Sequence, residues 1–304
     1  MNRIPCVLAL GVAIVLVVNT SRAADPLAPV PPAPAVTAAE KVIRDVYKAD
    51  YAKKKTADQL ELAWKLLKAG EATTNDPTNR YTLFQEARTI AIKAGDVALA
   101  LSAADATCRE FEVNHADLTI TTLEAAAKGS SPTTVVEIAL DEVEHQIQAD
   151  NYPTASRFLK VAAAAAGRAN SPTLTAAVAA KMKEVEATQK ALEATEPERK
   201  VLAKTPDDPI AAARVGRFLC LIKGDWQAGL PLLAKGEDEK LKAAVLKDLA
   251  RPSDALAKVD VADSWYDLGE GFDPRERTQA RMRSLLWYQQ AAPSLTGICQ
   301  RSRR

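Results

Sequence analysis

The chain has 304 residues, of which 47% are hydrophobic and 5% aromatic, a composition typical of a folded protein with one large domain or two small ones. Its 40 basic and 39 acidic residues nearly cancel, so bulk charge gives no basis for binding to nucleic acid or to an acidic membrane surface. Much of the apolar content is alanine, which favours helices but buries little area, so we expect many closely packed helices.

The N-terminus predicts a secretory signal peptide over residues 1–23. Arg3 precedes an apolar run over 4–18, and small residues at Ser21 and Ala23 fit a cleavage site. The run is short for a membrane-spanning helix, so an uncleaved anchor is the less favoured alternative. We therefore expect a secreted or periplasmic protein of the cell envelope, with no membrane span after cleavage.

Cleavage would leave three cysteines, Cys108, Cys220 and Cys299. Disulfides can form outside the cytoplasm, but an odd number leaves at least one thiol without a partner in the chain. The spacing leaves the pairing open. Burial as a small apolar residue is the favoured interpretation for Cys108 and Cys220.

Residues 24–36 are rich in proline and alanine and predict an extended linker. A helical domain is expected over 37–292, followed by a basic tail over 293–304. Two capping-box sequences, TAAE from Thr37 and TADQ from Thr56, predict the first helix starts. Each is followed by apolar residues at helical spacing, which are Ile43, Val46, Tyr47 and Tyr51 in the first helix and Leu60, Ala63, Trp64 and Leu67 in the second.

Three later helix starts share one device, a side-chain oxygen followed by proline. The pairs are Ser131-Pro132, Ser171-Pro172 and Asp208-Pro209. The oxygen can cap the helix, and proline suits the first helical position because no hydrogen-bond partner for its nitrogen is needed there. No stretch alternates apolar and polar residues in the manner of a strand, so the sequence predicts an all-α protein.

Three segments resemble one another around a tight turn: KAGDVALAL from Lys93, QADNYPTAS from Gln148 and IKGDWQAGL from Ile222. Each has a turn-forming pair, then an apolar or aromatic residue, then a small residue that lets two helices cross closely. These residues are Gly95, Asp96 and Ala100 in the first segment, Tyr152 and Ala155 in the second, and Gly224, Asp225, Trp226 and Gly229 in the third. The segments resemble the turn between the two helices of a tetratricopeptide repeat.

The segment WYDLGEGF carries the first-helix signature of that repeat, W-x2-L-G-x2-Y, with phenylalanine in the last position. The matching residues are Trp265, Leu268, Gly269 and Phe272, and Tyr288 and Ala291 match the second helix if DPRERTQ holds a few extra residues between the two helices. The chain is also similar to the helical-repeat region of secreted bacterial proteins. The resemblance covers roughly two thirds of the chain and implies helix hairpins stacked as a short α-solenoid of degenerate repeats.

The resemblance also implies roles for the residues of this segment. Trp265 and Phe272 would fill the core, and Gly269 would mark the closest approach of two helices. Asp263 and Asp267 would face solvent.

Cys108 and His115 form the strongest enzyme-like pair, since a helix running through both would place them on one face and Glu112 could orient the histidine. Against this, His115 is expected near the frayed end of a helix, beside Asn114. The favoured interpretation is a structural cysteine and no catalytic residue.

His145 is expected on a solvated helix face, paired with Asp141 one turn earlier, while Leu140, Val143 and Ile147 form the buried stripe. A metal site would need further ligands at suitable spacing. The acidic segment TPDDP from Thr205 reads as a linker whose Asp208 caps a helix. We therefore expect no metal and no cofactor.

Aromatic residues gather in the C-terminal part of the chain: Phe218, Trp226, Trp265, Tyr266, Phe272, Trp287 and Tyr288. Most should fill the core, and Trp226 and Tyr266 are the candidates for contact with a partner. The leading hypothesis is a non-catalytic module that binds a protein or peptide or serves as a scaffold. The rival is a secreted carbohydrate-binding protein or enzyme that uses Asp263, Asp267 and Trp226 on envelope polysaccharide.

Overall fold

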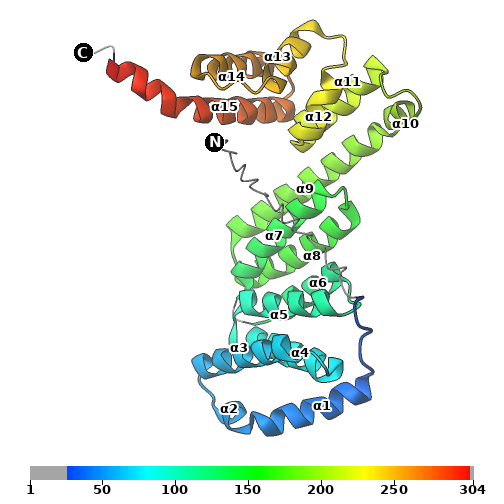
Figure 1. Ribbon diagram of the computed structural model, residues 1–304, viewed down its shortest axis with the longest axis vertical. Helices are drawn as coiled ribbons and strands as arrows, with labels where there is room; N and C mark the ends of the chain where they lie inside the picture. The colour runs from blue at the N-terminus through cyan, green and yellow to red at the C-terminus, as the bar shows by residue number, and fades with distance from the viewer. Residues whose placement is uncertain (1–25, 130, 302–304) are drawn as a thin grey trace, which may run out of the picture.

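The computed structural model describes residues 26–129 and 131–301, and 82% of the chain is helical with no strand among the described residues. Figure 1 shows an elongated molecule with α1 at one end and α13–α15 at the other, and the long helix α9 running obliquely between the two parts. The prediction of an all-α fold is confirmed. The predicted signal peptide lies outside the described residues.

The helices have the following bounds in chain order. They are α1 (Ala33–Val46), α2 (Lys48–Ala52), α3 (Thr56–Ala72), α4 (Pro77–Ala94), α5 (Val97–Glu110), α6 (His115–Ala127), α7 (Pro132–Gln148), α8 (Tyr152–Ala169), α9 (Pro172–Ala194), α10 (Glu196–Lys204), α11 (Pro209–Arg217), the π-helix η1 (Phe218–Lys223), α12 (Trp226–Leu233), α13 (Glu239–Leu249), α14 (Ala255–Glu270) and α15 (Pro274–Arg301). In this part of the chain, no helix has both the length and the apolar character needed to cross a bilayer.

Each helix packs mainly against its neighbours in sequence, and alternate helices also touch. Contacts of α4 with α6 and of α6 with α8 place these three helices in one layer of the N-terminal stack. The hydrophobic core is correspondingly divided along the chain. Phe84 and Phe111 fill the first part, Phe158 the second and Trp265 the third. This succession of local cores is typical of a helical-repeat architecture.

All three predicted turns join two helices. Gly95, Asp150 and Gly224 have left-handed backbone angles, with φ of 84°, 55° and 79°. The next residue caps the following helix in each case: Asp96 accepts a hydrogen bond from the Leu99 amide, Asn151 from Thr154 and Asp225 from Ala228.

The first two turns connect the helix layers in opposite directions. The turn at Gly95 leads out of the α4–α6–α8 layer, whereas the turn at Asp150 leads back into it from α7. Similar turn sequences therefore do not mark one constant repeat register.

The proline-marked helix starts are confirmed for α7, α9 and α11. Ser171 and Asp208 accept hydrogen bonds from the amides of Leu174 and Ala211. The Ser131 hydroxyl instead donates to the Gly95 carbonyl at 2.8 Å, so it ties the turn before α7 to the turn after α4.

The two capping boxes are not formed. Helix α1 begins at Ala33, inside the predicted linker, and the Thr37 hydroxyl donates to the Ala33 carbonyl within the helix. Helix α3 begins without a side-chain cap, and the Gln59 amide donates to the Lys53 carbonyl at 2.6 Å. Proline is tolerated in a first helical turn, so the Pro-rich sequence supports the start of α1.

The N-terminal end of the predicted linker is also bound to the stack. The Ala28 amide donates to the Glu110 carbonyl at 2.8 Å, and the Glu112 amide donates to the Ala28 carbonyl at 2.9 Å.

The buried faces of the first helices differ from the predicted ones, since Val46 is 72% and Trp64 49% exposed. Helix α3 instead buries Leu62, Ala63, Leu66, Leu67 and Gly70.

Candidate functional site

Three hollows follow one another along the N-terminal stack. The first lies between α4 and α6, the second between α6 and α8 and the third between α8 and α9, with volumes of about 290, 260 and 250 Å³. Helix α6 borders the first two, and Lys160 lines the second and third. We call the three hollows together the stack groove.

The floor of the stack groove consists of small and aliphatic side chains. Ala127, Val161 and Ala164 line its central hollow, and Ile92 and Ala125 line the first. Because alanine is small, the helices pack closely and the furrow between them stays open. A larger side chain would fill this furrow. The alanine-rich composition thus produces both the packed helices and the hollows between them.

The rim of the stack groove is basic. Lys93, Lys128, Lys160 and Arg168 are exposed there, and none forms an ion pair with another described residue. Arg88 is the fifth cation, and the carboxylates lining the groove are Glu124 and Glu186, which gives a net charge of +3. This excess is local, since the whole chain has a net charge of only +1.

Arg88 differs from the exposed cations. Its guanidinium donates to the Gln85 side chain at 2.5 Å and to the Thr122 hydroxyl at 3.3 Å, and burial lowers its pKa. Glu186 is already paired with Lys190 at 2.7 Å. The exposed lysines and Arg168 are therefore the groups available to a ligand.

Sequence reasoning missed the stack groove, although a signal exists. Lys93 lies in the last turn of α4, Lys128 caps the C-terminus of α6, and Arg168 lies in the last turn of α8. Cations favour helix C-termini because of the helix dipole, so each alone has a local explanation. Their recurrence on alternate helices becomes informative only once these helices are known to form one layer.

A second polar centre lies in the C-terminal part, around the buried carboxylate of Asp248. It accepts hydrogen bonds from the indole nitrogens of Trp265 and Trp287, at 2.7 and 3.1 Å, and from two guanidinium nitrogens of Arg283, at 2.8 and 2.5 Å. Trp226 packs edge-on against Trp265, with ring centroids 4.8 Å apart. This centre joins α13, α14 and α15.

The residues of the repeat signature lie at the contact of α14 with α15. Trp265 is fully buried, and Leu268 and Phe272 pack against the hydrophobic core that contains it. A Cβ added at Gly269 would lie 3.4 Å from the Ala280 methyl group, so the two helices approach closely there. Ala291 is also buried. Helix α15 begins at Pro274, so only Asp273 of DPRERTQ lies before the helix.

The predicted partner contacts occupy different environments. Trp226 is half-buried and lines a cavity of about 120 Å³, while Tyr266 is 45% exposed beneath the Arg281 guanidinium. Asp263 and Asp267 are exposed and do not line the Trp226 cavity, and the Tyr288 hydroxyl donates to Asp263 at 2.5 Å. The acids and the tryptophan of the rival hypothesis are not brought together.

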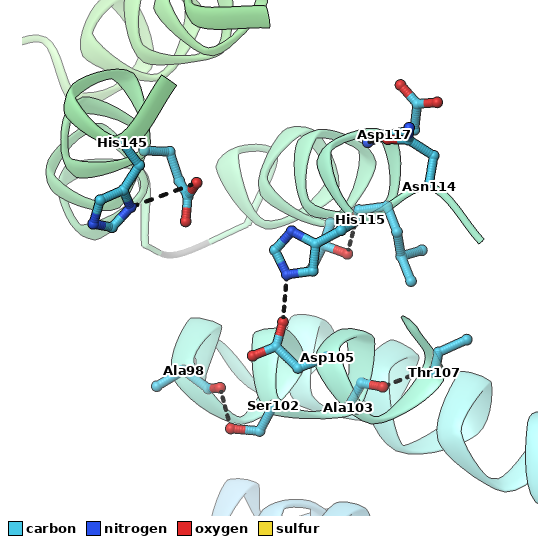
Figure 2. A network of polar contacts seen from close by, with 12 residues as sticks. Ala98, Ser102, Ala103, Asp105, Thr107, Asn114, His115, Asp117 and His145 are labelled. Atoms are coloured by element: carbon cyan, nitrogen blue, oxygen red, sulfur yellow. Dashed lines mark hydrogen bonds and ion pairs between the residues drawn. The ribbon is translucent and has the colours of Figure 1, made fainter. Parts of the chain in front are cut away.

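Cys108 and His115 do not form a pair. Helix α5 ends at Glu110, and His115 is the first residue of α6, which Asn114 caps by accepting the Asp117 amide. Figure 2 shows His115 directed toward Asp105, with Nε2 3.0 Å from the carboxylate. The expectation of a frayed helix end at His115 was wrong.

The thiols lack the features of an activated nucleophile. Burial raises the pKa of the Cys108 thiol, which is the opposite of activation, and it raises the pKa of the Cys220 thiol as well. Both thiols are free. The side chain of Cys299 lies outside the described part.

His145 is exposed, as expected, but its nearest carboxylate belongs to Glu142, at 3.9 Å, and not to Asp141 (Figure 2). Within residues 26–129 and 131–301, no three histidine, cysteine or acidic side chains gather in a way that could hold a metal ion.

The chain matches no model of a known protein family, no curated protein and no solved structure. The resemblance to tetratricopeptide repeats therefore rests on the residues of its signature and turns. Any functional assignment rests on the geometry and charge described above.

Proposed function

We propose that the protein is a non-catalytic, secreted or periplasmic binding module of tetratricopeptide-like type, which holds an extended acidic segment of a partner protein in the stack groove. The observation that carries the proposal is the row of cations along three consecutive hollows with an apolar floor. These cations, Lys93, Lys128, Lys160 and Arg168, form no ion pair with any other residue that the structure describes. The N-terminal sequence pattern supports the location in the cell envelope.

The dimensions of the stack groove favour a polypeptide over a compact ligand. Packed helices lie about 8–10 Å apart, so a segment crossing from α4 to α9 spans roughly 25 Å. An extended chain rises about 3.3 Å per residue, so about eight residues fill the groove. Their carboxylates would meet the rim while alternate side chains contact the floor.

The charge pattern favours acidic residues in that segment. A basic groove attracts an acidic partner during encounter, and rim charges act mainly on the association rate and on its salt dependence. Because the cations have no partner within the described part of the chain, binding breaks no existing ion pair. The apolar floor adds contacts that do not depend on charge.

The test is fluorescence anisotropy of the mature chain, residues 24–304, with a labelled ten-residue peptide of alternating glutamate and leucine. A peptide with glutamine in place of glutamate is the neutral probe. Reversing Lys128 and Lys160 together to glutamate should weaken binding of the acidic peptide at least about tenfold, which corresponds to about 1.4 kcal/mol.

The matched control reverses Lys41 and Lys54, which are exposed, lie outside the stack groove and pair with no acidic residue in the described part of the chain. It changes the net charge by the same amount and should leave affinity within about twofold, since distant exposed charges are screened by salt. Equal weakening by both double variants, or equal binding of the neutral peptide, would contradict the proposal.

A further inference from the structure

Two adjoining cavities lie in the C-terminal part, where the start of α12, the loop between α13 and α14, and α15 meet. Their volumes are about 120 and 380 Å³, and Arg251 and Arg283 line both. We call the two together the arginine pocket. It shares no residue with the stack groove.

The Arg283 guanidinium lines the arginine pocket and is held in place by its neighbours. Its bidentate hydrogen bonds to Asp248 use two of its five N–H donors and leave three for a ligand. Trp226 and Trp287 also stack on it, with its central carbon 5.1 and 5.8 Å from the ring centroids. An arginine held in place loses little freedom when it binds an anion, which favours affinity.

Asp248 does not compete with such an anion. It accepts four hydrogen bonds, three at Oδ2 from Trp265, Trp287 and Arg283 and one at Oδ1 from Arg283. It is only 1% exposed. Its role is to position Arg283.

Arg251 occupies a backbone position that favours glycine. Its φ is 46°, just beyond the C-terminus of α13, where helices commonly carry glycine in this left-handed conformation. Its exposed side chain has no carboxylate partner among the described residues.

The charge of the larger cavity is entirely positive. Arg251, Lys258 and Arg283 line it, and no acidic residue does. The Lys258 ammonium donates a long hydrogen bond, 3.5 Å, to the Gln290 carbonyl. The smaller cavity is bordered by Trp226, Leu230 and Leu249, and also by Gln227 and by Asp248, whose carboxylate is bound by Arg283.

We propose that the arginine pocket binds a small organic anion. Its carboxylate or phosphate group lies among Arg251, Lys258 and Arg283, and a single ring or short apolar chain contacts Trp226 in the smaller cavity. The two cavities together suit a small molecule rather than a polypeptide. This inference does not depend on the proposed function of the stack groove.

The test is calorimetric titration of the mature chain with phenylacetate and with phenyl phosphate, alongside benzyl alcohol as the neutral probe and inorganic phosphate as the anion without a ring. At least one aromatic anion should bind at least tenfold more tightly than benzyl alcohol and than inorganic phosphate. The tighter of the two identifies the head group as carboxylate or phosphate. Absence of binding by both at millimolar concentration, or equal affinity for benzyl alcohol, would overturn the proposal.

Arg251→Gly is the decisive variant, because glycine suits the backbone at this position and the fold should be retained. It should weaken binding of the aromatic anion at least tenfold without lowering Tm. Lys240→Ala, an exposed residue of α13 outside the arginine pocket, should leave binding unchanged. Unchanged affinity in Arg251→Gly would overturn the assignment of the anion site.

Discussion

Glycine and alanine determine how closely the helices of the C-terminal part approach. A Cβ at Gly229 would lie 2.4 Å from the Cys220 sulfur, closer than real Cβ atoms come to a neighbour, and at a tight 3.0 Å from the Gly216 carbonyl oxygen. Gly167, in α8, has nothing within 4 Å of the same position. Two helical glycines therefore have opposite structural roles.

Gly229→Ala should lower the free energy of unfolding by about 1–3 kcal/mol, because the added methyl group overpacks the contact of α12 with η1. Gly167→Ala is the matched control and should raise it by about 0.5–1 kcal/mol, because alanine restricts the unfolded chain and favours helix. Urea unfolding followed by circular dichroism measures both. Equal effects of the two substitutions would contradict the assignment of Gly229 as a close contact.

At the scale of elements, helices α13, α14 and α15 meet at a buried ionic centre. Asp248 comes from α13, Trp265 from α14, and Arg283 and Trp287 from α15. The exposed fractions of the Asp248 and Arg283 side chains are 1% and 16%. A buried pair of this kind makes removal of one partner costly, since the other is left as an uncompensated charge.

Asp248→Asn should lower the free energy of unfolding by about 3–5 kcal/mol, because Arg283 loses its counter-charge away from water. The control is Asp260→Asn, which breaks an exposed pair with Lys247 and should cost less than about 1 kcal/mol. Both are measured by urea unfolding. A loss of less than about 1 kcal/mol in Asp248→Asn would contradict the role assigned to this centre.

At the scale of the whole molecule, a few polar contacts join the N-terminal stack to the C-terminal helices. Lys223 of η1, whose side chain is 4% exposed, pairs with Asp150 in the turn between α7 and α8 at 2.8 Å. Arg275 of α15 donates to the Thr188 hydroxyl of α9. Helix α9, which runs between the two parts in Figure 1, buries only Val178, Val185 and Thr188.

Lys223→Met should uncouple the two parts during unfolding, because Asp150 loses its nearest cation. Three of the four tryptophans lie in α12, α14 and α15, so tryptophan fluorescence reports mainly on the C-terminal part and circular dichroism on all helices. We expect the fluorescence transition in urea to move to lower concentration than the circular dichroism transition.

The control for this experiment is Lys247→Met, which removes an exposed lysine of α13 and should keep the two transitions together. Coincident transitions in Lys223→Met would show that the Lys223–Asp150 pair does not couple the two parts.

The features that the sequence predicted correctly are local ones. The starts of α9 and α11 depend on a side chain that accepts from an amide three residues away, and α7 begins at its proline. The turns at Gly95 and Gly224 depend on one left-handed residue followed by a capping aspartate. Such interactions form between residues close in sequence, so residue types and spacing suffice to predict them.

Tertiary structure alone decided the partners of residues that are far apart in sequence. Helical spacing placed Val46 and Trp64 in buried stripes, but the angle at which their helices pack leaves them exposed. His115 meets Asp105 because a new helix begins at the histidine, and the cations of the stack groove meet only because alternate helices form one layer. Helix formation in this protein follows from local sequence, whereas its binding surfaces follow from the packing of helices, which no local pattern specifies.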